Sequence, residues 1–241
     1  MIIMRAKNVM KWVIFIGVLF FIFQPAQAAT IGFGLDSRIS GTRNPRGTAP
    51  WVTAGFENMT GNEAKLLASS EAALASSTGV KLVMNTSDLV GAENVRKWYF
   101  NFDNPNVDVN DLKFKYIGAL STGPKDQGIR TDEDKIEVRN DGFFDIRFAF
   151  GINGEHFGKG EEVVYLITAP GGGDIDASDF SSRSLNRVSP GYFSAAKING
   201  VRNALYEVSI IGTSAVPIPG AVWLLGSGLV GLALIRKRFK N

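Results

Sequence analysis

Histidine and cysteine, two side chains that often act as nucleophiles, general bases and metal ligands, are nearly absent from this chain. Its 241 residues include one histidine, His156, and no cysteine. A thiol nucleophile, a disulfide framework, a thiolate zinc site and a multi-histidine metal site are therefore excluded within one chain. A hydrolytic triad would depend on His156, yet no Gly-x-Ser-x-Gly motif supplies its serine. Because His156 lies between Gly154 and Gly158, we expect it in an exposed loop, and we expect no enzymatic activity.

Two acidic clusters are the remaining candidates for a metal site. Alternate carboxylates on a bending loop can offer several oxygens to a hard cation such as calcium. Neither cluster has the twelve-residue EF-hand spacing, so solvated turn acids are the competing interpretation, and we expect no required cofactor. The first cluster contains Asp132 and Asp134, on a polar connection, and the second contains Asp174, Asp176 and Asp179, after three glycines.

Aromatic rings offer another kind of chemistry, because sugar faces stack on exposed aromatic side chains. Trp51, Tyr99 and Tyr192 are the candidates. Aromatic residues of a β-sandwich are usually in the core, but Tyr99 falls on the face opposite Trp98 and Phe100 if this segment is a strand. Glycan binding is therefore an alternative function. A carbohydrate-active hydrolase is a weaker one, because the separation of its two carboxylates is not visible in a sequence.

The elements that would position these residues show a period of two. Aromatic and aliphatic residues alternate with polar ones, which predicts strands with one face in a core and one toward water. The alternating positions are Trp98, Phe100 and Phe102; Leu112, Phe114 and Tyr116; and Phe144, Ile146, Phe148 and Phe150. Further predicted strands are Val80–Met84, Val163–Thr168, Tyr192–Ile198 and Leu205–Ile211.

This pattern predicts an all-β ectodomain of about eight to ten strands, on the scale of a β-sandwich or jelly roll. One segment differs. Asn62 to Ser77 is rich in Ala, Leu and Glu, and Leu67 and Leu74 lie seven residues apart. We expect one short inserted helix there, capped by Asn62.

The N-terminus has the pattern of a secretory signal. Basic residues precede an uninterrupted apolar run over Trp12–Phe23, and the small residues Ala26 and Ala28 follow it. This pattern predicts cleavage by signal peptidase after Ala28, so that the mature chain starts near Ala29. The alternative is an uncleaved anchor, although the run is short for a hydrocarbon core about 30 Å thick.

The C-terminus has the pattern of a membrane anchor. The apolar segment Ala221–Ile235 predicts a transmembrane helix. It is followed by the cations Arg236, Lys237 and Arg238, which would stay in the cytoplasm and leave the preceding chain outside.

Most of the excess positive charge lies in these two ends. The sequence pI is about 9.1, which by itself would suggest an anionic partner such as nucleic acid. Residues 30–216, however, contain 19 basic and 23 acidic residues, a net charge of −4. We therefore expect no nucleic-acid partner.

The C-terminal pattern also resembles a known family. Val216, Pro217, Ile218 and Pro219 precede the Gly-interrupted apolar segment and its basic end, and this order is similar to the PEP-CTERM sorting signal of Gram-negative bacteria. Ile218 replaces the glutamate of the usual motif, as in a Pro-Ile-Pro variant. The resemblance implies recognition by an exosortase and an association with exopolysaccharide and biofilm. An ordinary single-pass anchor is the alternative.

A second resemblance covers roughly residues 51 to 212. The segments Trp98–Phe102, Asp141–Phe148 and Phe157–Tyr165 resemble a recurring ectodomain of proteins with this C-terminal sorting signal. The resemblance supports the expected fold but implies no activity for this chain. We therefore expect an exported surface or matrix protein with a structural or adhesive role. Its expected parts are a signal peptide (1–28), an irregular lead-in (29–50), a β-sandwich (51–212), a linker with the sorting motif (213–220), a transmembrane helix (221–235) and a basic cytoplasmic end (236–241).

Overall fold

The computed structural model describes residues 30–41, 43–60, 63–64, 78–126, 128–138, 142–151, 155–169, 173–185, 191–201 and 208–213. The predicted signal peptide, sorting motif and C-terminal helix lie outside these residues, as does the predicted helix 62–77 apart from Glu63 and Ala64. Across the described ranges, no helix has the length and apolar character needed to span a membrane.

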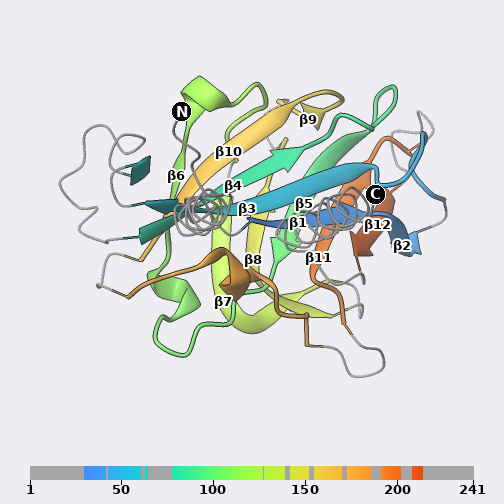
Figure 1. The fold of residues 1–241 in the computed structure, drawn as a ribbon. Coiled ribbons are helices and arrows are strands. Elements are labelled where there is room, and N and C mark those ends of the chain that lie inside the picture. Colours follow the sequence, from blue (N-terminus) through green and yellow to red (C-terminus); the bar gives the residue numbers. More distant parts are fainter. Residues whose placement is uncertain are drawn as a thin grey trace, which may run out of the picture.

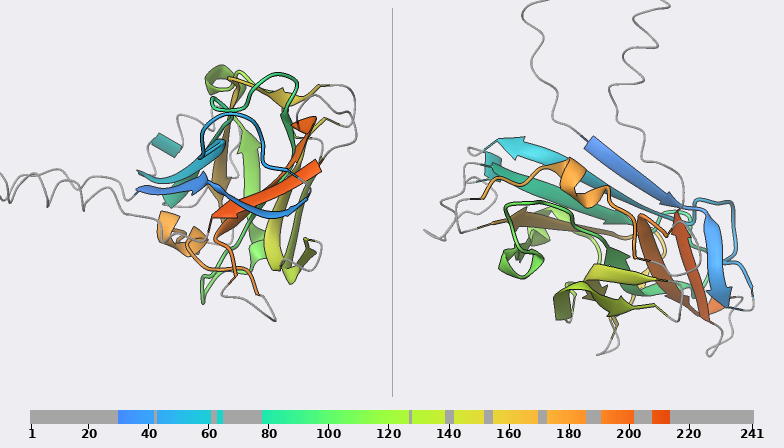
Figure 2. Two further views of the ribbon diagram at one scale, coloured as in Figure 1. Left: turned by 90° about the vertical axis from the view of Figure 1, so that its right-hand side faces the viewer. Right: turned by 90° about the horizontal axis from the view of Figure 1, so that it is seen from below.

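The described residues form two antiparallel sheets that lie against each other as layers (Figures 1 and 2). The predicted all-β, sandwich-like class is thus confirmed. In spatial order, the first sheet contains β1 (Thr30–Leu35), β3 (Val52–Thr60), β4 (Thr78–Asn85), β10 (Glu162–Thr168) and β6 (Lys113–Tyr116). The second contains β2 (Ser37–Gly41), β12 (Val208–Thr213), β11 (Ser194–Asn199), β5 (Asn94–Phe100), β8 (Phe143–Ala149) and β7 (Gly128–Glu137), and β9 (Phe157–Gly158) also pairs with β5.

Short single-turn 3₁₀ helices complete the described elements: η1 (Val109–Asp111), η2 (Gly118–Leu120) and η3 (Ala177–Phe180). The lead-in contributes β1 and β2, which are edge strands of different sheets. The chain therefore crosses from one layer to the other at Asp36, between these two strands.

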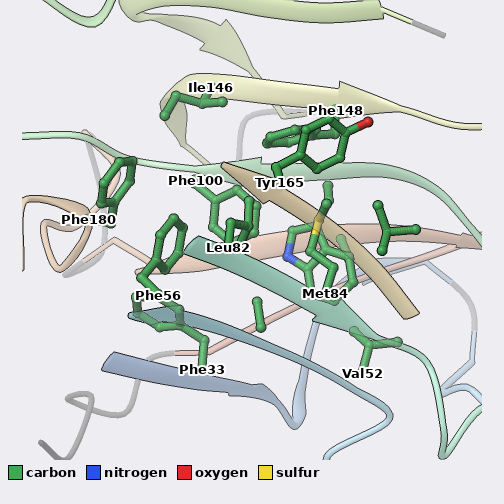
Figure 3. Packing of buried hydrophobic residues seen from close by; sticks show 14 of the residues in the cluster. Phe33, Val52, Phe56, Leu82, Met84, Phe100, Ile146, Phe148, Tyr165 and Phe180 are labelled. Atoms are coloured by element: carbon green, nitrogen blue, oxygen red, sulfur yellow. The ribbon is translucent and has the colours of Figure 1, made fainter. Parts of the chain in front are cut away.

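The space between the sheets is filled mainly by aromatic rings (Figure 3). Phe56 of the first sheet meets Phe100 of the second edge to face, with ring centroids 5.1 Å apart, and it stacks on Phe180 at 4.3 Å. Phe148 contacts Tyr165 across the layers, with centroids 5.0 Å apart. Each such buried side chain contributes roughly 1.5–3 kcal/mol before conformational entropy is subtracted.

One predicted face is wrong at Phe144. Ile146, Phe148 and Phe150 enter the main core as expected, but Phe144 belongs to a separate cluster with Tyr99, their ring centroids 5.7 Å apart. The reason is an irregularity at Asp145: Ile146 pairs with Thr131 of β7, whereas Phe144 pairs with Ile136. A shift of register reverses the face on which a side chain lies.

The expectation that the second face of each strand meets water is also wrong in part. Tyr99 is only 5% exposed, although it points away from the main core. On the first sheet, Val164 and Leu166 of β10 are buried in a further cluster with Ile117. Both sheets therefore carry apolar residues on their outer faces as well as between them.

Candidate ligand-binding face

Cations gather on the outer face of the second sheet, around its central strand β5. Lys97 of β5 pairs directly with Lys197 of β11. Two residues further along β5, Tyr99 pairs with Arg147 of β8, and Arg147 in turn pairs with Arg130 of β7. Residues that pair directly across strands project on the same side of a sheet. Because Trp98 and Phe100 fill the main core, these side chains lie on the opposite, outer side.

A bulge in β5 adds a further cation. The register between β5 and β11 shifts between Lys197 and Ile198, so that Lys197 pairs with Lys97 but Ile198 pairs with Val95. Val95 and Trp98 both enter the main core. Arg96 and Lys97, the two residues between them, therefore stay outside it, as an extra residue in one strand allows. The Arg96 guanidinium donates a hydrogen bond from Nη1 to the carbonyl oxygen of Gly151, at 2.5 Å.

We call Lys97, Arg147 and Lys197, with Arg96 and Arg130 at their margin, the basic face. Burial holds the pKa of Lys97 below its usual 10.5, and the charges of Arg147, Lys197 and Arg96 act in the same direction. Among the described residues, neither Lys97 nor Arg147 forms a salt bridge, and the buried Nε of Arg147 has no hydrogen-bond partner. Arg130 differs, because it pairs with Asp132 at 3.0 Å.

Beside these cations lies an apolar floor. Tyr99 packs on Phe144, and burial raises its pKa to about 12. The floor is completed by Ile136, Val138, Ala195 and Ile210, with Ile39 and Tyr192 packed against it at its edge. It lies on the same outer side of the sheet as the cations, because Tyr99 pairs with both Arg147 and Ala195.

The structure separates the three candidate sugar-binding aromatics. Tyr99 and Tyr192 meet in the same cluster under the basic face, whereas Trp51 is 4% exposed and belongs to the main core. His156 is exposed just before β9, as predicted. Tyr99 was correctly placed on the face opposite Trp98, but its ring is covered by neighbours and is not an open stacking platform.

The first acidic cluster belongs to β7 rather than to a connection. Asp132 accepts hydrogen bonds from Lys135 and Arg130, each at 3.0 Å, and these two bonds lower its pKa. Asp134 has a positive φ of 47° within the irregular part of β7. Its backbone N–H donates to Asp145 at 2.6 Å, so the cluster shapes the bulge beside Phe144.

The second acidic cluster caps a helical turn. Asp176 accepts a hydrogen bond from the Ser178 backbone, and Asp179 accepts one from the Asp176 backbone, each at 2.8 Å, which forms a capping box at η3. Asn104 binds both the Asp174 carbonyl oxygen and the Asp179 carboxylate. In the parts of the chain that the structure describes, no group of three or more His, Cys, Asp or Glu is placed to hold a metal ion. Calcium binding stays a prediction.

A cleft of about 450 Å³ lies beside the loop that follows β5, between Phe102 and Asp111, with Glu133 of β7 on its border. One of its carboxylates already serves a local turn: Asp108 caps η1 by accepting a hydrogen bond from the Asn110 backbone N–H, at 2.8 Å. On the basic face, by contrast, neither Lys97 nor Arg147 forms a salt bridge among the described residues, and this face is therefore the stronger candidate for binding.

Sequence reasoning missed the basic face. Its signal was present, because the residues that alternate with the buried ones in β5, β8 and β11 include Lys97, Arg147 and Lys197. Three predicted strands thus carried cations at their outward positions. Only the strand order, which brings β8, β5 and β11 side by side, shows that these cations lie together.

The signal-peptidase site (Ala26, Ala28 and Ala29), the sorting motif (216–219) and the terminal cations (236–238) lie outside the described residues. Comparison of the chain with protein-family models, with curated proteins and with solved structures found no match in any of the three.

Proposed function

We propose that this chain is an exported protein, sorted by an exosortase, with a structural or adhesive role at the cell surface or in the extracellular matrix. The two terminal sequence patterns support export and sorting. In this proposal, signal peptidase removes residues 1–28, the predicted helix Ala221–Ile235 holds the chain in the inner membrane, and an exosortase acts near Val216–Pro219. The finer fold, a jelly-roll-like sandwich with a helix over Asn62–Ser77, belongs to the same proposal.

The observation that carries the adhesive role is the basic face. Lys97 and Arg147 stand on a sheet whose other side is packed with aromatic rings, so the fold sets their backbone positions before any partner arrives. Neither of them forms a salt bridge among the described residues. Such a face is suited to contact with an anionic component of the envelope or matrix, and exopolysaccharide is the partner we propose.

A glycan-binding module without a structural duty is the second candidate. It is favoured by Tyr192, whose ring is only partly buried at the edge of the cluster that contains Tyr99. The two candidates differ in whether they need the C-terminal sorting signal. A glycan-binding module can bind without being sorted, whereas a matrix component must be delivered to the matrix before it can act.

Fractionation of cells that express the full chain tests the proposal. With an exosortase present, the chain should reach the surface or the medium. Without the exosortase, it should remain in the inner membrane, with a reporter after Asn241 in the cytoplasm and one after Ser214 outside. Release that is equal in both strains would contradict the sorting step, and a cytoplasmic reporter at Ser214 would contradict the topology.

A further inference from the structure

We infer that the basic face binds a linear polysaccharide that bears carboxylate groups, along a path that crosses strands β8, β5 and β11. This inference rests on the proposed function, since it names the ligand class of the adhesive face.

The geometry gives the direction of the path. Arg147, Lys97 and Lys197 come from three neighbouring strands, and neighbouring strands lie about 4.8 Å apart. The cations therefore form a row across the sheet rather than a single pocket. A row of separated, partly exposed charges fits an extended polymer with repeated anionic groups better than it fits a small ion.

The charge arrangement favours an anionic ligand. Like charges directly opposite each other destabilise a sheet, and this sheet has two such pairs, Lys97 with Lys197 and Arg130 with Arg147. Arg130 is compensated by Asp132. The charges that act on Lys97 are all cationic, and no acidic side chain reaches Lys97 or Arg147 among the described residues. A bound polyanion would supply the missing counter-charge.

The chemistry of Arg147 favours carboxylate. Its planar guanidinium can donate two parallel hydrogen bonds to one carboxylate from its two terminal nitrogens, whereas its Nε is buried. Neutral sugars would supply no counter-charge to Lys97 or Arg147, neither of which forms a salt bridge among the described residues. The buried ring of Tyr99 contributes an apolar floor rather than a stacking surface, so charge supplies the recognition.

Nucleic acid is disfavoured by the same observations. Double-stranded DNA carries a charge about every 1.7 Å, whereas residues 30–216 have a net charge of −4 that would repel so dense a polyanion. Proteins that bind single strands offer aromatic rings on which bases stack, and Tyr99 is covered. A polysaccharide with one carboxylate per sugar is less densely charged than duplex DNA and needs no base stacking, so it meets the small cationic row at a lower electrostatic cost.

Binding of the full chain, purified in a non-ionic detergent, tests the inference. The probes are alginate and polygalacturonate, both carboxylated, with neutral dextran and duplex DNA for comparison. We expect both carboxylated polymers to bind, with an affinity that falls as salt rises. Lys97→Gln and Arg147→Gln should each weaken this binding about tenfold. Lys113→Gln, at an exposed position of β6 in the other sheet, is the matched control and should bind as the wild type does.

If Arg147→Gln is unstable, Lys97→Gln still tests the inference. This substitution removes the repulsion between Lys97 and Lys197, so the variant should fold at least as well as the wild type. Failure of both carboxylated polymers to bind would overturn the inference. Equal binding of dextran, tighter binding of DNA, or an equal loss in Lys113→Gln would overturn it as well. A chain that is exported and sorted but binds neither polymer would refute only this inference. A chain that binds alginate but is never exported would refute only the proposed function.

Discussion

Lys97 and Lys197 face each other directly across the ladder between β5 and β11, at the point where the register of that ladder shifts. Two ammonium groups in this relation repel each other, and burial of Lys97 increases the cost of its charge. Stability is thus reduced at the position where we propose that a ligand binds, a relation often seen at functional sites.

Removal of one of these charges should stabilise the protein. We expect Lys97→Gln to raise the free energy of unfolding by about 0.2–1 kcal/mol, because like charges opposite each other in a sheet cost about this much. Urea denaturation at low salt measures the effect, which should shrink when salt screens the charges. The exposed Lys113→Gln should leave stability unchanged, and a loss of stability in Lys97→Gln would contradict the argument.

Lys97 should also make stability depend on pH in the alkaline range. The pKa of Lys97 is 10.5 in the unfolded chain and lies below 10.5 in the native protein. At pH values between the native and the unfolded pKa, the unfolded chain therefore binds the proton more strongly than the native protein does. Stability must therefore rise with pH through this window. Comparison of the unfolding free energy of wild type and Lys97→Gln at several pH values isolates this contribution, which should vanish in the variant.

Tyr99 should have the opposite effect at higher pH. Its native pKa is about 12 and its ordinary value is 10.0, so the neutral phenol contributes stability that is complete below pH 10 and is lost as pH rises toward 12. The expected loss is roughly 2–3 kcal/mol. Titration of tyrosine absorbance should show one group ionising near pH 12 in the wild type and absent from Tyr99→Phe. Ionisation of Tyr99 near pH 10 would show that its ring is open to water.

Two neighbouring substitutions on β8 test the two faces of the second sheet. Phe148 is completely buried among Phe100, Phe114 and Tyr165, so Phe148→Asp should unfold the domain by burying a charge without a partner. Arg147→Asp should be mild, because it places an anion beside Lys97 and Arg130. Thermal melts compare the two, and equal damage would contradict the assignment of their faces.

The irregularity in the ladder between β7 and β8 depends on Asp145. Its two carboxylate oxygens accept backbone hydrogen bonds from Phe102, at 2.9 Å, and from Asp134, at 2.6 Å. Asp145→Asn replaces one acceptor by a donor that faces another donor, so it should destabilise the protein by about 1–3 kcal/mol. Asp134→Asn is the control, because asparagine tolerates a positive φ. Denaturant midpoints measure both, and equal shifts would argue against this role of Asp145.

The class of fold was predictable because alternation of apolar and polar residues reports burial on one side of a strand. This alternation is clear in β5, β6 and β8. It is hidden in β7, where Asp132, Glu133 and Asp134 interrupt the strand, and β7 was therefore taken for a connection. The face of Phe144 was missed for the same reason, since a bulge leaves no mark in the spacing of apolar residues.

The basic face was beyond the reach of sequence reasoning for a different reason. Lys97 and Lys197 are 100 residues apart in the chain, and only the pairing of β5 with β11 makes them neighbours. The position of a cation on a strand can be read from local pattern. The order of the strands depends on contacts between distant parts of the chain, which local pattern does not contain.

The place of β12 has a mechanical consequence. This strand ends at Thr213 and is held on both sides, by β11 and by β2 (Figure 2), and only β11 separates it from β5. If a pull beyond Thr213 is directed along β12, the hydrogen bonds on both flanks share the load instead of opening one after another. If a polymer holds β5 while the tail is anchored, tension passes between them through a single intervening strand. The rest of the sandwich then carries little of the force.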